Sequence, residues 1–112
     1  MQVISERAGI DTVADRPLQD LIRQRVQALD EFNDYELGEL VKFVVVDAGD
    51  TLEAIDTALG FSIADATPEL IEHHAGYFEI VFIVSDDGFG VEVFVPVAAD
   101  VPPELLAMCT AP

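Results

Sequence analysis

The chain has 112 residues, 51% of them apolar, and its 22 acidic residues against 5 basic ones give a formal net charge of −17 at pH 7. A chain of this length and apolar content can bury one core, so we expect residues 1–112 to form a single domain. The excess of negative charge argues against direct binding to nucleic acid or to an anionic membrane, because both require Lys or Arg to displace counterions. The expected partners are basic proteins or cations.

The charges are unevenly placed, since all five basic residues lie in the first 42 positions and residues 43–112 contain no Lys or Arg. Cys109 is the only cysteine. An internal disulfide and a thiolate zinc site both need a second cysteine, so a reducing cytoplasm is the expected location. Charged residues near the N-terminus interrupt the apolar segment that a signal peptide needs, and no apolar run is long enough to span a membrane.

Residues 1–14 show no clear period and are predicted to be a mobile arm or a short strand. Asp15 precedes Pro17 and can cap a helix that we predict over residues 16–31. Apolar side chains recur along this helix at helical spacing: Leu18, Leu21, Ile22, Val26 and Leu29. A β-branched run then predicts a buried strand over residues 41–47.

A second helix is predicted over residues 51–59. Asp50 is its predicted N-cap, Glu53 stands three residues later as in a capping box, and Gly60 falls where a left-handed C-terminal cap belongs. Residues 61–63 are predicted to be a short strand.

Two further helices are predicted in the second half of the chain. Thr67 and Pro68 have the form of a helix start, so PELIEHH is predicted to be a two-turn helix that ends at Gly76. Asp100 and two prolines precede ELLAMC, which is predicted to be a short C-terminal helix.

The stretch YFEIVFIVSDDGFGVEVFVPV predicts a β-hairpin with strands over residues 77–84 and 91–97. A two-residue or four-residue turn within SDDGFG would set Val84 opposite Val91 and place alternate apolar side chains on one face. The other face mixes apolar and acidic residues, which indicates partial cover by a helix or a partner chain. Pro96 cannot donate a hydrogen bond to a neighbouring strand, which indicates an edge at least near that end.

The predicted fold is therefore α+β, with a small sheet of three or four strands that is largely antiparallel or mixed. Helices 16–31 and 51–59 are predicted to pack on the one apolar face. The strand and helix over residues 41–59 allow a parallel pair of strands. A C2 homodimer is predicted through the valine-rich edge of the hairpin or through its half-apolar second face.

No catalytic motif is visible. The chain lacks GxGxxG, a P-loop and GxSxG, and no nucleophile and base are visibly arranged together. Cys109 lies beside Met108 near the C-terminus, where a packed or idle thiol is the ordinary case. We predict no enzyme, no catalytic residue and no cofactor.

His73 and His74 are adjacent, and on the predicted helix they point about 100° apart, so they cannot share a metal as an i, i+4 pair does. Their ordinary role is at a helix C-terminus, where the dipole favours them and Glu69 can pair with His73. The alternative is a zinc or iron site that uses His73, His74 and Glu69 with nearby carboxylates. A specific calcium site at Asp86 and Asp87 is disfavoured, because too few EF-hand ligands are present.

The residues predicted to bind a basic partner by pairing with its Lys or Arg are Asp50, Glu53, Asp56, Glu69, Glu72, Asp86 and Asp87. The resulting prediction is a non-enzymatic cytoplasmic interaction protein, for example an inhibitor, an immunity-type protein or a nucleic-acid mimic. A small-ligand-binding or metal-binding domain is the rival. An acidic, lysine-poor surface is also what solubility or a host with high internal salt selects, and the sequence leaves that interpretation open.

Overall fold

The computed structural model describes residues 1–32, 41–74, 76–83, 90–97 and 100–110. In chain order its elements are β1 (Gln2–Ile4), α1 (Arg7–Ile10), α2 (Arg16–Phe32), β2 (Val41–Val45), α3 (Leu52–Leu59), the 3-10 helix η1 (Ile63–Asp65), β3 (Leu70–His74), β4 (Tyr77–Ile83), β5 (Gly90–Pro96) and α4 (Pro103–Thr110). The strands form one 5-stranded sheet in the order β1-β2-β5-β4-β3. Strands β2 and β5 are parallel and the other described pairs are antiparallel. The predicted α+β class and the mixed sheet are confirmed, although the sheet has more strands than the three or four predicted.

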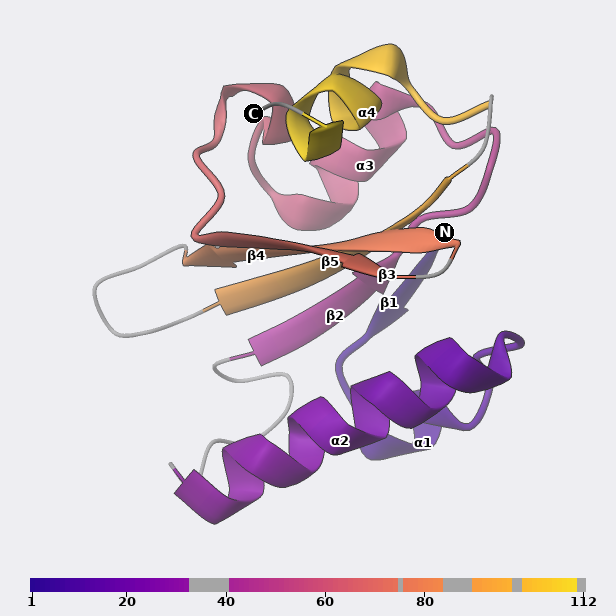
Figure 1. The fold of residues 1–112 in the computed structure, drawn as a ribbon, viewed down its shortest axis with the longest axis vertical. Helices are drawn as coiled ribbons and strands as arrows, with labels where there is room; N and C mark the ends of the chain where they lie inside the picture. The colour runs from indigo at the N-terminus through magenta and orange to yellow at the C-terminus, as the bar shows by residue number, and fades with distance from the viewer. Residues whose placement is uncertain (33–40, 75, 84–89, 98–99, 111–112) are drawn as a thin grey trace.

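Helices cover both faces of the sheet (Figure 1). Helices α1 and α2 lie on one face, and α3, η1 and α4 lie on the other. On the α3 side, Val93 of β5 packs in a buried cluster with Ile55 and Leu105. On the α2 side, Phe94 packs in a second cluster with Ile22. The prediction that both long helices share one face is wrong, because both faces of the central strands carry large apolar side chains and each one needs cover.

The first long helix, α2, forms as its sequence pattern predicts. The carboxylate of Asp15 accepts a hydrogen bond from the backbone N–H of Leu18 over 3.0 Å, which caps the helix. Leu18, Ile22 and Val26 are buried against the sheet. The side chain of Leu29 lies outside the described part of the structure.

Helix α3 begins one residue later than its predicted cap suggests. Thr51 is the N-cap, and its side-chain oxygen accepts from the backbone N–H of Ala54 over 3.1 Å. The carboxylate of Asp50 instead accepts from the backbone N–H of Asp47. Gly60 closes the helix with φ of 85°, in the left-handed conformation that was predicted for it.

The predicted helix PELIEHH is wrong, because its last five residues form strand β3. β3 pairs antiparallel with β4, and the short connection through Gly76, whose φ is 91°, makes a tight hairpin. Pairing with a strongly β-forming neighbour overrides the helix preference of Leu and Glu. The predicted strand over residues 61–63 is also wrong, since η1 begins there, while residues 1–14 hold β1 and α1.

The hairpin of β4 and β5 has the predicted face but not the predicted register. Phe82 lies opposite Val91, and Phe78 lies opposite Val95, two residues away from the predicted pairing. A two-residue slip keeps every side chain on the same face, so the apolar set still points into one cluster. The predicted turn at Asp86 and Asp87, and Val84 with it, lie outside the described residues.

Strand β5 is interior, between β2 and β4, so it is not an edge along its length; the edge predicted near Pro96 is confirmed only on the β2 side of that end. Pro96 is accommodated because the pairing with β2 ends at Phe94. The second face of the hairpin is covered by α2 at Phe94 and Tyr77, whereas Ile83 at its far end stays 55% exposed. The valine-rich strand of the predicted dimer is thus paired within the chain, and its second face is partly covered.

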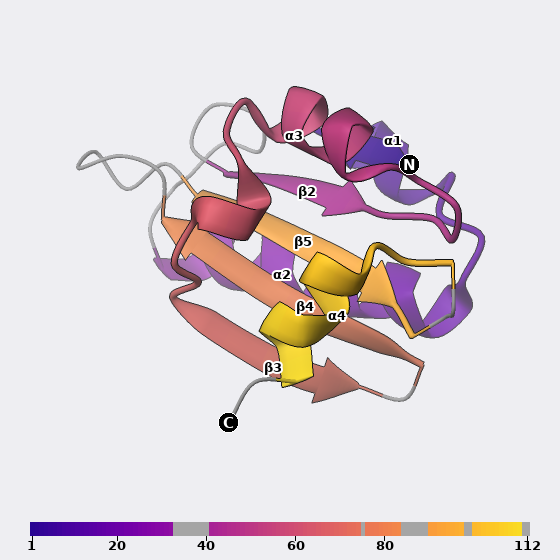
Figure 2. The same ribbon diagram turned by 90° about the horizontal axis from the view of Figure 1, so that it is seen from above.

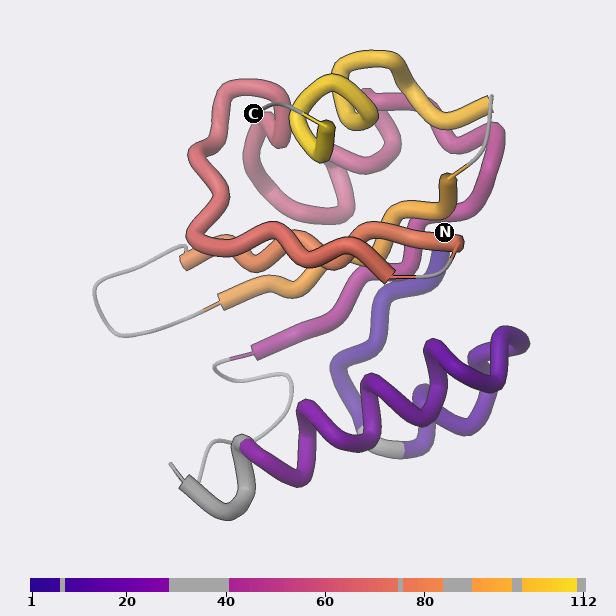
Figure 3. Tube along the Cα trace, in the orientation of Figure 1, coloured from indigo at the N-terminus to yellow at the C-terminus, as the bar shows by residue number. Residues whose placement is uncertain are grey.

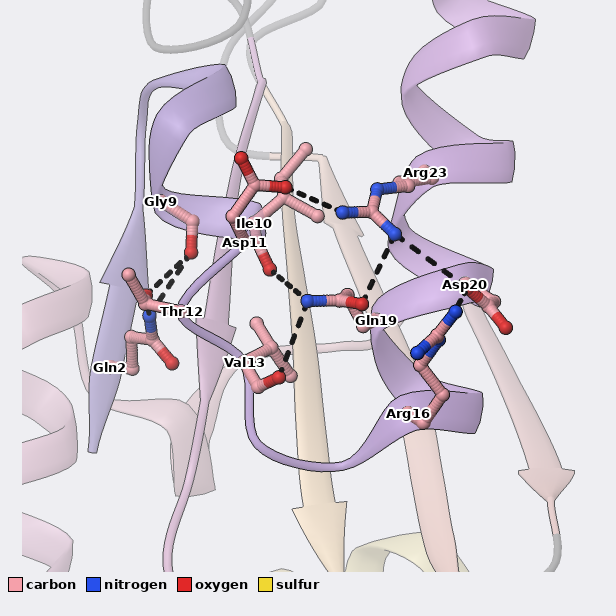
Figure 4. Close-up of polar contacts among 10 residues, drawn as sticks. All are labelled: Gln2, Gly9, Ile10, Asp11, Thr12, Val13, Arg16, Gln19, Asp20 and Arg23. Carbon is pink, nitrogen blue, oxygen red and sulfur yellow. Dashed lines mark hydrogen bonds and ion pairs between the residues drawn. The ribbon is translucent and has the colours of Figure 1, made fainter.

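The chain path from β1 to α2 (Figure 3) is fixed by polar contacts around the buried Gln19 (Figure 4). The amide nitrogen of Gln19 donates to the carbonyl oxygens of Ile10 over 3.1 Å and Val13 over 3.4 Å. Its side-chain oxygen accepts from Arg23 over 3.1 Å. These bonds satisfy buried polar groups and set the position of α2 under the sheet. None of the helices in the described ranges is long and apolar enough to cross a membrane.

Candidate functional site

The strand register brings acidic side chains together on the face that α2 covers. Glu72 of β3 lies directly opposite Glu79 of β4. Arg25 of α2 meets both of them. Its Nε donates to Glu79 Oε2 over 3.0 Å, and its Nη2 donates to Glu79 Oε1 over 2.9 Å and to Glu72 Oε2 over 3.2 Å. The Arg25–Glu79 contact is therefore bidentate, which is the strongest geometry for this pair.

His74 and Glu92 complete this cluster. His74 Nε2 lies 3.0 Å from Glu79 Oε1. Because an ionised carboxylate only accepts, the Nε2 nitrogen carries the proton. Glu79 is 1% exposed. Burial raises its pKa, but hydrogen bonds from Arg25 and His74 outweigh burial and hold the pKa below its ordinary value.

Glu92 is the neutral acid of the cluster. Burial, followed by the charge of Glu79 and a hydrogen bond with it, raises the pKa of Glu92 to about 8. At neutral pH the carboxyl group of Glu92 therefore stays protonated, and its O–H donates a hydrogen bond to Glu79. Two carboxyl groups in contact share one proton in this way when the site has too few cations to neutralise both.

The cluster can do two things chemically. It holds α2 on the sheet, because Arg25 is the α2 side chain that satisfies the buried Glu79. It also presents ligands for a cation, since Glu72, His74 and Glu79 each offer one atom within 4.8 Å of the others. Glu72 is 42% exposed and His74 24%, so the cluster opens to solvent on the β3 side.

The predicted metal set of His73, His74 and Glu69 is not brought together. Neighbouring residues on a strand point to opposite faces. His73 Nε2 lies 3.0 Å from the carbonyl oxygen of Cys109, whereas His74 points to the α2 face. Glu69 is exposed ahead of β3. Of the three predicted ligands, only His74 lies in the cluster.

The predicted partner-binding acids do not form one surface. Asp56 accepts a hydrogen bond from the backbone N–H of Ile63 over 2.9 Å, and Asp50 accepts one from the backbone N–H of Asp47. Both carboxylates therefore stabilise the local fold. Glu53 is exposed on α3. Glu72 belongs to the cluster on the α2 face, and Glu69 is exposed just before β3. Asp86 and Asp87 lie outside the described residues.

Charge instead separates by layer. The layer of α3, η1 and α4 exposes acids that we call the α3–α4 acidic surface: Glu53, Asp65, Asp100 and Glu104. No Lys or Arg follows Lys42 in the sequence. Lys42 itself donates to the carbonyl oxygen of Ala58 over 3.2 Å, near the C-terminal end of α3.

On the α2 side, by contrast, arginines pair with Asp11 and Asp20 (Figure 4). Arg16 lies 3.7 Å from Asp20, and Arg23 lies 3.8 Å from the same carboxylate and also pairs with Asp11. These exposed pairs add little stability, but they neutralise the charges of that layer locally. Among the described residues, the exposed acids without an arginine partner therefore include those over α3 and α4.

A pocket of about 390 Å³ lies far from the cluster, at the other end of β4. Its lining includes Phe61, Thr67 and Phe82. A small ligand held there would not meet either histidine.

Burial raises the pKa of the Cys109 thiol to about 11, so the reactive thiolate is scarce at neutral pH.

Sequence reasoning missed Arg25, Glu79 and Glu92. A signal was present for the two acids, because each interrupts an otherwise apolar strand in YFEIVFIV and VEVFV. A buried acid needs a partner. No signal identified Arg25 as that partner, since it is 54 residues away from Glu79.

No protein-family model, curated protein or solved structure matches this chain.

Replacing Arg25 tests the structural role of the cluster. Arg25→Met keeps a long side chain but leaves Glu79 as a buried charge with too few donors, and we expect a loss of about 2 to 3 kcal/mol in the free energy of unfolding. The double variant Arg25→Met, Glu79→Leu should recover most of that loss. Denaturant unfolding measures both. The control Arg23→Met breaks only exposed pairs and should cost less than about 1 kcal/mol; equal losses in the two single variants would contradict the assignment.

The shared proton predicts a dependence of stability on pH. The pKa of Glu92 is about 8 in the folded chain against 4.5 ordinarily. Between these two pH values Glu92 is protonated in the folded chain and ionised in the unfolded chain, so unfolding releases a proton. The free energy of unfolding should therefore fall as pH rises through this window. The pKa of Glu79 is lowered, so its ionised form stabilises the fold, and that stabilisation is lost only in more acidic solution, outside this pH window.

Glu92→Gln keeps the donor but cannot titrate, so its stability should change less across the window and exceed that of the wild type at its upper end. Denaturant unfolding at a series of pH values measures this. The exposed acid Glu53 provides the matched control, and Glu53→Gln should keep the wild-type slope. An unchanged slope in Glu92→Gln would show that Glu92 is not the titrating group.

Proposed function

We propose that this chain is a non-enzymatic cytoplasmic interaction protein that binds a basic protein through the α3–α4 acidic surface. The observation that carries the proposal is the separation of charge by layer. Acids are exposed over α3, η1 and α4, whereas on the α2 side Asp20 and Asp11 are paired with arginines.

A surface of one sign attracts a partner of the other sign over a distance and orients it before contact. Lys42 is bound to a helix carbonyl, no Lys or Arg follows it in the sequence, and the N-terminal ammonium of Met1 is paired with Asp47 and Asp50. Among the described residues, no ion pair involves an acid of the α3–α4 acidic surface, so these carboxylates can meet Lys or Arg of a partner. Binding of this kind weakens as salt screens the charges.

The proposal keeps the predicted partner class and changes the residues. Glu53 remains from the predicted set. Asp65, Asp100 and Glu104 join it, because the packing of η1 and α4 beside α3 places them in one layer. Asp50 and Asp56 leave the set because their carboxylates bind backbone N–H groups of the chain itself.

Neutralising the surface should weaken partner binding. In Glu53→Gln, Asp65→Asn, Glu104→Gln we expect at least a tenfold loss of affinity at low salt and a shallower dependence on salt, because exposed interfacial pairs act mainly through long-range attraction. The partner is captured from a lysate of cells that contain the chain, and its binding to purified variants is then titrated at several salt concentrations.

The matched control for this triple variant is Glu6→Gln, Asp11→Asn, Asp20→Asn, which removes the same charge from the α1 and α2 layer. It should bind nearly as the wild type does. Equal losses in both triple variants would mean that net charge alone acts. The absence of a captured protein at any salt concentration would favour solubility or adaptation to salt.

Metal binding is a second candidate, favoured by the compact set of Glu72, His74 and Glu79. Two carboxylates and one imidazole are a ligand set that zinc accepts, with a further position left for water. It ranks second because Arg25 Nη2 already lies against both carboxylates, so a metal would have to displace that contact.

Zinc titration separates this candidate from the first. If the site binds Zn²⁺, a saturating concentration should raise the melting temperature by on the order of 5 °C or more. His74→Ala should abolish the shift. His73→Ala is the control, because its ring points to the other face of the sheet. Equal shifts in both variants, or none in the wild type, would exclude the site.

A further inference from the structure

Strand β3 is an edge of the sheet, and no described element lies beyond it (Figure 2). An antiparallel strand with one neighbour uses only half of its backbone groups. The N–H and C=O groups of every second residue in Leu70–His74 therefore point away from β4. They are available to pair with another strand.

Natural proteins usually protect such an edge with proline, lysine, a bulge or a covering element. β3 contains neither proline nor lysine, and its first residue, Leu70, is 49% exposed. Its five residues pair with β4 in one unbroken register. The other edge, β1, has only three residues and lies beside α1. β3 is thus the more open of the two edges.

The side chains along β3 define what a neighbouring strand would meet. Leu70 and Glu72 lie on the α2 side, and Ile71 lies between them on the α4 side. Glu72 is 42% exposed, and Glu69, just before the strand, is also exposed. An added strand would therefore face apolar surface at Leu70 and Ile71 and negative charge on either side of them.

A second copy of the chain fits this edge poorly. An antiparallel two-fold pairing centred on Glu72 would set that carboxylate against its own copy, and like charges directly opposite each other are destabilising. Each copy also carries a net charge of −17. A basic strand has complementary charge and meets neither objection.

We propose that β3 accepts an extended basic segment of a partner protein as an additional antiparallel strand. A Lys or Arg of that segment faces Glu72, and two apolar residues after it face Ile71 and Leu70. Backbone hydrogen bonds supply the affinity and these side-chain pairs the selectivity, as in other complexes formed by strand addition. The inference rests on the proposed function, because it names a binding mode for the same class of partner.

The test uses a fluorescent peptide, KTKVIKK with both ends blocked. Antiparallel alignment sets the Lys at its third position opposite Glu72, Val opposite Ile71, Ile opposite Leu70 and the next Lys opposite Glu69. Two further forms of the peptide carry N-methyl groups on alternate residues. In one form the methyl groups replace the N–H donors that would face β3, and in the other they replace the donors that would face away from it. Fluorescence anisotropy measures binding to the full chain at low salt, and amide exchange measured by NMR reports on β3.

All three peptides have the same charge, so they differ only in which backbone donors remain. Strand addition predicts that the form methylated on the donors facing β3 loses about tenfold or more in affinity, since two or three hydrogen bonds are removed. The other methylated form should bind nearly as the parent peptide does. Amide exchange in β3 should slow when the parent peptide binds.

Two protein variants complete the design. Glu72→Gln should weaken binding of the parent peptide several-fold, and Glu53→Gln on α3 should leave it nearly unchanged. Unfolding curves verify that both variants fold, because Glu72 also contacts Arg25.

Equal binding of all three peptides, or no binding of the parent peptide, overturns strand addition. The proposed function is decided separately, by the triple variant of the α3–α4 acidic surface and its captured partner. If the chain alone dimerises and the dimer protects the β3 amides from exchange, the edge is occupied by a second copy, and the proposal is wrong.

Discussion

The central strands β2, β5 and β4 bury side chains on both faces of the sheet, and the rest of the structure depends on this constraint. Val93 and Phe94 are neighbours on β5 that point to opposite faces, and both are at most 1% exposed. Each face therefore needs its own cover. Helix α2 supplies one cover, and α3 with α4 supplies the other, which gives the three layers seen in Figure 1.

Covering both faces also buries a charge. Glu79 lies on the face that α2 covers, and a carboxylate in that position is stable only with several donors. Arg25 provides two of them, His74 one, and Glu92 retains a proton. The same contacts hold α2 over β3 and β4. The packing of α2 on the sheet and the neutralisation of the buried Glu79 therefore depend on the same side chain, Arg25.

The three layers also sort the remaining charge. Three of the five basic residues, Arg16, Arg23 and Arg25, lie in α2 on one side of the sheet, and they pair there with acids. The opposite layer is built from a stretch of sequence without Lys or Arg. An uneven distribution along the chain becomes an uneven distribution between two faces. The proposed binding of a basic partner rests on this uneven distribution.

Elements with a strong local pattern could be predicted from the sequence. The apolar period of α2, its Asp15 cap and the Gly60 cap of α3 are local features, and the structure has all three. β3 could not be predicted, because Leu and Glu favour a helix and the deciding force is pairing with β4. That error placed His73 and His74 on a helix and so directed the metal hypothesis to the wrong ligands.

The sequence by itself determined the α+β class, the acidic character and the face of the hairpin that carries the apolar side chains, because composition and a period of two survive a change of register. Only the tertiary structure decided that β5 is interior, that Arg25 meets Glu79 and that β3 is left as an open edge. These features depend on contacts between residues far apart in the chain. Local preference and spacing carry no information about such contacts, because they arise from the simultaneous burial of both faces of one sheet.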